Sequence, residues 1–153
     1  MTDETSRRDS VTVEPTFPMT RGEFDAFESE LHPTLLALQR TLQTSDRSVI
    51  IIVSGVEGAG KGEVVDRLNY WFDARGVETH GFWRNSDEER ERPAFWRFWR
   101  AMPQRGRIAV LFGSWYTEPI VERVFKRWKK RAFGERIEEI KRLEEMLVAD
   151  GTI

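Results

Sequence analysis

A glycine-rich segment near the middle of the chain has the residue types and the spacing of a phosphate-binding turn. Residues 55–61, Gly-Val-Glu-Gly-Ala-Gly-Lys, match the pattern G-x-x-x-x-G-K, and another glycine follows directly. Glycines allow the backbone to curl until successive N–H groups point at an anion, and a lysine adds a full positive charge. We therefore expect phosphate groups to bind at Gly55, Gly58, Ala59, Gly60, Lys61 and Gly62. A tight turn without a ligand is the alternative, but it needs neither four glycines nor the lysine.

Two positions of this turn depart from the usual phosphate loop. The usual loop ends in Lys-Ser or Lys-Thr, whose hydroxyl binds Mg²⁺, whereas Gly62 and Glu63 follow Lys61 here. Glu57 lies inside the turn, where its carboxylate would repel phosphates unless it bound Mg²⁺ or faced a nucleophile. We expect Glu57 to be a catalytic and metal-binding residue, and a solvent-facing turn residue is the alternative.

Apolar periodicity predicts alternating strands and helices on both sides of the turn. Strands are expected over 49–54, 77–83 and 107–112, and helices over 20–42, 61–75, 93–102, 117–128 and 137–147. The first strand is apolar on both faces, which is typical of a central parallel strand. A bend is expected at Pro33 and a helix break at Gly134. The alternation predicts an α/β fold, with a parallel sheet flanked by helices.

Length and composition predict one globular domain over residues 19–153, preceded by a flexible tail over 1–18. The chain of 153 residues stops after a helix and a turn, where another strand is expected, so we expect it to be truncated at its C-terminus. The net charge of −2 argues against nucleic acid as a partner. No apolar run approaches the roughly 18 residues of a membrane span. The absence of cysteine fits a cytoplasmic location.

Four segments together resemble the polyphosphate kinase 2 family, and most closely its two-domain polyphosphate:AMP phosphotransferases. They are residues 53–63, 87–93, 96–99 and 112–116, and the resemblance extends from Thr20 to Ile153. It implies a three-layer P-loop kinase-like fold and phosphoryl transfer between inorganic polyphosphate and AMP or ADP, with Mg²⁺ as cofactor. It also implies a second homologous domain or a homo-oligomer as partner.

The resemblance implies roles for particular residues. The loop lysine of the family falls at Lys61, its loop aspartate at Glu57, and the arginine after its acidic stretch at Arg97, so these three are the expected catalytic residues. Arg90, Arg92, Trp115 and Tyr116 are expected to contact polyphosphate or nucleotide. Ion pairing within the acidic stretch is the alternative for the two arginines. Burial in the core is the usual fate of tryptophans at helical spacing. Trp115 and Tyr116 are the exception, because they follow the end of a parallel strand, where ligands of such sheets bind.

Two positions depart from the catalytic members of the family. Those members carry an acidic residue or asparagine and then an arginine before Ser-Trp-Tyr, where this chain has Phe112 and Gly113. A phenylalanine does not bind Mg²⁺, and a glycine cannot neutralise the charge of phosphoryl transfer. The expectation is therefore a degenerate half of a two-domain phosphotransferase. A non-catalytic module that binds polyphosphate or docks on an active partner domain is the alternative.

Overall fold

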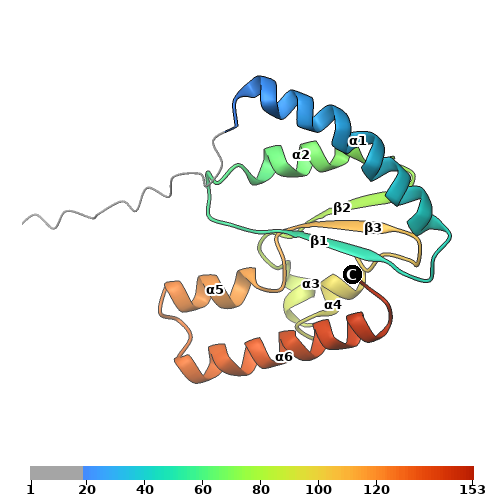
Figure 1. Ribbon diagram of the computed structural model, residues 1–153. Coiled ribbons are helices and arrows are strands. Elements are labelled where there is room, and N and C mark those ends of the chain that lie inside the picture. Colours follow the sequence, from blue (N-terminus) through green and yellow to red (C-terminus); the bar gives the residue numbers. More distant parts are fainter. Residues whose placement is uncertain (1–18) are drawn as a thin grey trace, which may run out of the picture.

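The computed structural model describes residues 19–153, so the expected tail over residues 1–18 lies outside the described part. Nine elements follow one another along this part of the chain (Figure 1). They are α1 (Arg21–Gln43), β1 (Val49–Val53), α2 (Lys61–Trp71), β2 (Val77–Gly81), α3 (Asp87–Arg90), α4 (Trp96–Trp99), β3 (Ile108–Phe112), α5 (Thr117–Val124) and α6 (Lys130–Ala149). None of these helices is long and apolar enough to cross a membrane.

The three strands form one parallel sheet between two layers of helices, which confirms the expected α/β architecture. Helices α1 and α2 cover one face, and α3 to α6 lie on the other (Figure 1). Side chains of β3 alternate between the two faces: Ile108 and Val110 pack with Val65 of α2, while Ala109 and Leu111 pack in a second cluster that includes α6. The core therefore lies on both sides of β3.

The order of the three strands is β1-β3-β2, and β1 also pairs on its other side, through a parallel bridge between Ser48 and Thr152. Strand β3 is central, and Ile108, Ala109, Val110 and Leu111 are all buried. Strand β1 is apolar on both faces because helices cover both faces of the sheet. This holds for strands at the edge of the sheet as well as at its centre. On the side of β1 away from β3, the carbonyl of Ile153 accepts a hydrogen bond from the Ile50 amide at 2.8 Å.

The expected helix break at Gly134 is wrong. Helix α6 begins at Lys130 and continues through Gly134. Gly134 faces open space, so no packing contact is lost because it has no side chain, and the helix is not interrupted. The break lies earlier, where Lys126 has φ of +56° and the chain leaves α5 before Trp128. Helix α1 includes Pro33, in agreement with the expected helix over 20–42.

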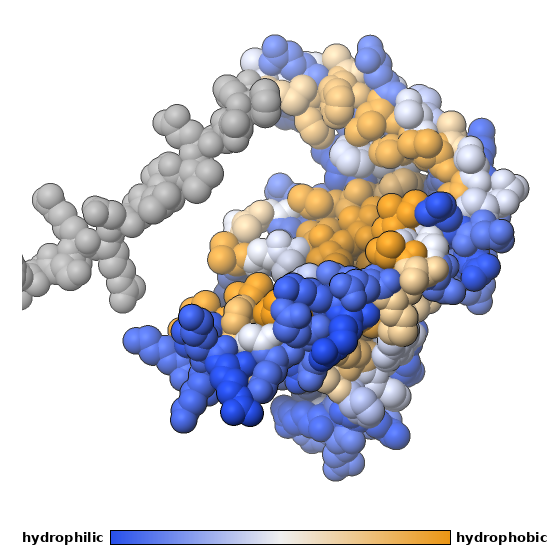
Figure 2. All heavy atoms as spheres, turned by 60° about the horizontal axis from the view of Figure 1, so that its bottom comes forward, coloured by the Kyte–Doolittle hydropathy of each residue, from blue (hydrophilic) through white to orange (hydrophobic). Residues whose placement is uncertain are grey.

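The connection between β2 and β3 contains short helices instead of one longer helix. Ser86 and Glu89 form a reciprocal capping box that begins α3, in the segment between 83 and 93 where no helix is expected. Only Trp96–Trp99 is helical in the segment expected to be helical over 93–102. Charged side chains cover much of the solvent face of α6, and apolar side chains gather between it and the α1 layer behind (Figure 2).

Candidate functional site

The glycine-rich turn connects the end of β1 to the start of α2, as the sequence predicts. Gly58 and Gly60 have φ of +79° and +74°, a left-handed conformation that side chains disfavour. Gly60 is the N-cap of α2, and no side chain caps this end. Within residues 19–153, no hydrogen-bond acceptor is found for the amides of Lys61, Gly62 and Glu63. The positive end of α2 therefore presents free donors, which is the arrangement that binds anions.

The side chain of Lys61 folds back over this turn. Its Nζ donates a hydrogen bond to the carbonyl of Val56 at 2.5 Å. A Cβ at Gly55 would lie 3.7 Å from the Cδ atom of Lys61, so the lysine stem passes close to the loop backbone. The ammonium thus lies against the loop backbone, where a phosphate could replace the carbonyl as its partner.

Glu57 is exposed in the loop, and it makes no ion pair or hydrogen bond with the residues that the structure describes. No group of three or more metal-ligating side chains occurs in that same part of the chain. Mg²⁺ usually binds through one or two carboxylates together with substrate phosphates and water. The residues present therefore fit a Mg²⁺ ion that Glu57 and bound phosphates would hold jointly.

The end of β3 lies directly beside the loop. The amide of Gly113 donates to the carbonyl of Val53 at 3.0 Å, and the amide of Phe82 donates to the carbonyl of Phe112 at 2.8 Å. Gly113 has φ of +86°, and a Cβ there would lie 2.5 Å from the Phe82 carbonyl oxygen. This backbone therefore leaves no room for a side chain at the position where catalytic relatives are expected to carry arginine.

Arg97 is held at the same edge of the sheet by partners that the sequence analysis did not identify. Its Nη1 donates to the carbonyl of Trp83 at 3.1 Å and to the side-chain oxygen of Asn85. Its Nε lies 3.4 Å from Glu89 and has no hydrogen bond, although it is buried. The guanidinium also lies 5.0 Å from the centre of the Phe82 ring. Arg97 therefore anchors the segment that follows β2, and no spacing in the sequence indicates these contacts.

Arg90 and Arg92 form ion pairs within their own segment. Arg90 lies 2.8 Å from Asp87, and Arg92 lies 3.4 Å from Glu88. Arg92 also lies over the ring of Trp96, at 5.3 Å from its centre. Both side chains are more than half exposed, so a polyanion could still compete for them.

Trp115 and Tyr116 lie behind the edge of the sheet, against α6. Trp115 is 4% exposed and belongs to the core. Its Nε1 and the Tyr116 hydroxyl both donate to the same oxygen of Glu144, at 3.0 and 2.8 Å. Burial, together with this hydrogen bond and the charge of Glu144, raises the pKa of Tyr116 to about 12. The two aromatic side chains attach α6 to the end of β3.

The structure brings the loop, Arg97 and the end of β3 to the carboxyl edge of the sheet. Trp83 connects them, because its carbonyl binds Arg97 while its ring packs 5.5 Å from that of Phe112. Ligands of open parallel sheets bind outside this edge. The edge thus carries the free amides at the start of α2, the ammonium of Lys61, the carboxylate of Glu57 and the guanidinium of Arg97, only some of whose N–H groups are hydrogen-bonded. These groups suit the binding of a phosphate chain.

Comparison with known proteins gives a consistent result. The model of the family described as Polyphosphate kinase 2 matches residues 20–153. A polyphosphate:AMP phosphotransferase of Pseudomonas aeruginosa is 44% identical over 125 residues, which cover 81% of this chain and 25% of that protein. The phosphotransferase of the same name from Pseudomonas syringae pv. tomato is 37% identical over 131 residues, covering 85% of this chain and 26% of that protein. The chain thus spans about a quarter of the length of these relatives.

Solved structures resemble the fold. A crystal structure of a polyphosphate kinase 2 from Pseudomonas aeruginosa PA01 superimposes with a TM-score of 0.84 at 40% identity, covering 91% of this chain and 30% of that one. A polyphosphate kinase 2 from Arthrobacter aurescens TC1 gives a TM-score of 0.85 at 22% identity, covering 99% and 56% of the two chains. The second likeness is one of fold.

Proposed function

Since the chain belongs to the polyphosphate kinase 2 family, we propose that residues 19–153 form a phosphate-binding domain of a polyphosphate:nucleotide phosphotransferase. The observation that carries this proposal is the uncapped N-terminus of α2, together with the ammonium of Lys61 against the carbonyl of Val56 in the preceding loop. Inorganic polyphosphate and AMP or ADP are the proposed substrates, as the names of the relatives suggest. Gly55, Gly58, Ala59, Gly60 and Gly62 surround the bound phosphate.

Each catalytic residue has a proposed task in this reaction. Lys61 neutralises the oxygens of the transferred phosphoryl group, and Arg97 positions the segment after β2 and offers its remaining nitrogen to the phosphates. Glu57 would hold Mg²⁺, which would neutralise phosphate charge when bound. Catalysis of this kind depends mainly on positioning and on charge.

We further propose that this domain is the degenerate half of a two-domain enzyme. Phe112 and Gly113 lie beside the loop, and the backbone of Gly113 excludes a side chain. Removing one arginine from a phosphoryl-transfer site costs about 10³-fold or more in rate. The expected turnover of this chain alone is correspondingly small, and a second homologous domain supplies the missing groups.

An exposed apolar surface on α5 favours the alternative of a docking module. Ile120, Val124 and Phe125 are 48%, 69% and 65% exposed. Such a surface is stable in water when another domain covers it. In this alternative, the domain binds polyphosphate or only supports an active partner.

The test is phosphoryl transfer from polyphosphate to AMP and to ADP, measured with the chain alone beside direct binding of polyphosphate. We expect binding with little or no turnover, and we expect Lys61→Ala to weaken binding by about tenfold or more, because it removes a charge-assisted contact. Lys141→Ala, at an exposed ion pair on α6, is the matched control. Rapid turnover by the chain alone would contradict degeneracy, and equal binding by both lysine variants would contradict the loop site.

A further inference from the structure

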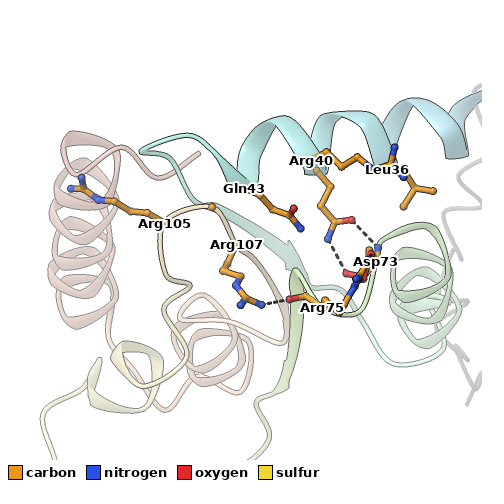
Figure 3. Close-up of a pocket in the computed structure, with 9 residues that line it drawn as sticks. Leu36, Arg40, Gln43, Asp73, Arg75, Arg105 and Arg107 are labelled. Atoms are coloured by element: carbon orange, nitrogen blue, oxygen red, sulfur yellow. Dashed lines mark hydrogen bonds and ion pairs between the residues drawn. The ribbon is translucent and has the colours of Figure 1, made fainter.

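A second cationic cavity lies at the end of the sheet opposite to the phosphate loop. It has a volume of about 500 Å³ and lies between α1, the turn after α2 and the turn before β3 (Figure 3). Strands β2 and β3 begin here, whereas the phosphate loop follows the far end of β1. Because a five-residue strand spans about 16 Å, the two places are separate sites.

The walls of this cavity are fixed by contacts between distant segments. Gln39 of α1 is 2% exposed, and its amide donates to the carbonyl of Asp73 at 2.9 Å and accepts from the Asp73 amide at 2.8 Å. On the other wall, Gly106 has φ of +81°, and a Cβ there would lie 2.9 Å from the carbonyl oxygen of Gln43. The backbones that carry the lining side chains are thus packed in place before any ligand binds, which lowers the entropy cost of binding.

The charge of the lining is strongly positive. Four arginines and one carboxylate line the cavity: Arg40, Arg75, Arg105, Arg107 and Asp73. Arg75 engages the carboxylate at 2.5 Å, and these hydrogen bonds lower the pKa of Asp73, so it remains ionised. Arg105 turns toward Asp150 on the far side, at 3.3 Å.

Arg40 and Arg107 remain without a carboxylate partner among the residues that the structure describes. The guanidinium of Arg107 donates to the carbonyl of Arg75, and the side chain of Arg40 runs along α1 toward Leu36, on the α1 wall of the cavity (Figure 3). Asp73 is the one carboxylate among the lining residues, so the four arginines leave an excess of positive charge that a bound polyanion would neutralise.

We propose that this cavity binds a linear inorganic oligophosphate, held mainly by Arg40 and Arg107. A flexible anion with several charges along its length can contact guanidinium groups from different segments at the same time. The planar guanidinium also forms paired hydrogen bonds with phosphate oxygens. The lining contains one apolar side chain, Leu36, and no aromatic ring on which a base could stack. A nucleotide carries similar phosphates, but its base would find no stacking partner in this cavity, so a nucleotide fits less well than an inorganic oligophosphate. This site is additional to the one under the proposed function.

The experiment measures tripolyphosphate binding by calorimetry to the full chain in a Lys61→Ala background, where the loop contributes least. Adding Arg40→Ala is expected to weaken the remaining binding by about tenfold, since one charge-assisted contact is lost. Arg142→Ala, an exposed helical arginine of α6, is the matched control and is expected to leave the affinity unchanged. Arg107→Ala provides a second, independent loss on the opposite wall.

The outcomes separate this proposal from that of the loop. Equal effects of Arg40→Ala and Arg142→Ala, or no binding left in the Lys61→Ala background, would overturn the cavity site. Binding that Lys61→Ala leaves intact and Arg40→Ala removes would support the cavity while contradicting the loop. ADP and citrate are measured as comparison ligands in the same experiment. If either one binds as tightly as tripolyphosphate, the assignment of the site to an inorganic oligophosphate is overturned.

Discussion

At the scale of single residues, the backbone at Gly113 prevents a simple substitution from restoring the arginine that catalytic relatives are expected to carry. Its positive φ and the carbonyl of Phe82, 2.5 Å from a hypothetical Cβ, both exclude a side chain. Inserting the arginine that catalytic relatives are expected to carry would therefore move the end of β3 or the segment after β2. The absence of a side chain at this position is built into the backbone beside the loop.

We expect Gly113→Ala to lower the free energy of unfolding by about 2 kcal/mol, because the alanine is strained at positive φ and collides with Phe82. Gly134→Ala is the control, since Gly134 lies in α6 with open space around it and should gain about 0.5–1 kcal/mol in helix stability. Urea unfolding measures both. A neutral Gly113→Ala would show that the two segments separate easily.

At the scale of elements, α6 is attached to the end of β3 by a buried polar contact as well as by apolar packing. One oxygen of Glu144 accepts from both Trp115 and Tyr116, next to the buried Ile140 and Leu143. This contact explains why Trp115 and Tyr116 lie in the interior, although they follow the end of a strand, where a ligand would be expected.

The contact at Glu144 predicts a loss of stability at high pH. The folded state raises the pKa of Tyr116 from 10.0 to about 12, so folding favours its protonated form. The resulting stabilisation is complete below about pH 10 and disappears as the pH rises through about 12. In Tyr70→Phe, Tyr116 is the only tyrosine, so its tyrosinate absorbance reports this titration directly.

Removing the hydroxyl tests the cause. Tyr116→Phe should abolish the part of the pH dependence of unfolding that lies between about pH 10 and 12. An unchanged pH profile in Tyr116→Phe would assign the alkaline loss of stability to other groups.

At the scale of the whole molecule, the sheet separates two cationic regions, and α1 is attached across the sequence to the turn after α2. Gln39 makes this attachment through both hydrogen bonds to the backbone of Asp73, 34 residues away. The carboxyl edge carries the candidate phosphate loop, and the amino edge carries the arginine cavity.

Gln39→Ala is expected to lower the free energy of unfolding by about 1–3 kcal/mol, because both hydrogen bonds between α1 and the backbone of Asp73 are lost. Gln43→Ala, an exposed glutamine of the same helix, should have little effect. The urea midpoint measures the difference, and an unchanged slope would show that α1 unfolds with the rest. Similar midpoints for both variants would show that α1 is held by apolar contacts alone.

The sequence by itself predicted the α/β alternation and the phosphate-binding turn, because apolar periodicity and glycine spacing act over a few neighbouring residues. It missed the central place of β3 and the continuity of α6, since strand order and packing around Gly134 depend on segments far apart in the chain. Only the tertiary structure brought Arg97 to Asn85, excluded a side chain at Gly113 and gathered Arg40 with Arg107 around one cavity. These contacts join distant residues, and no local pattern encodes which of them will meet.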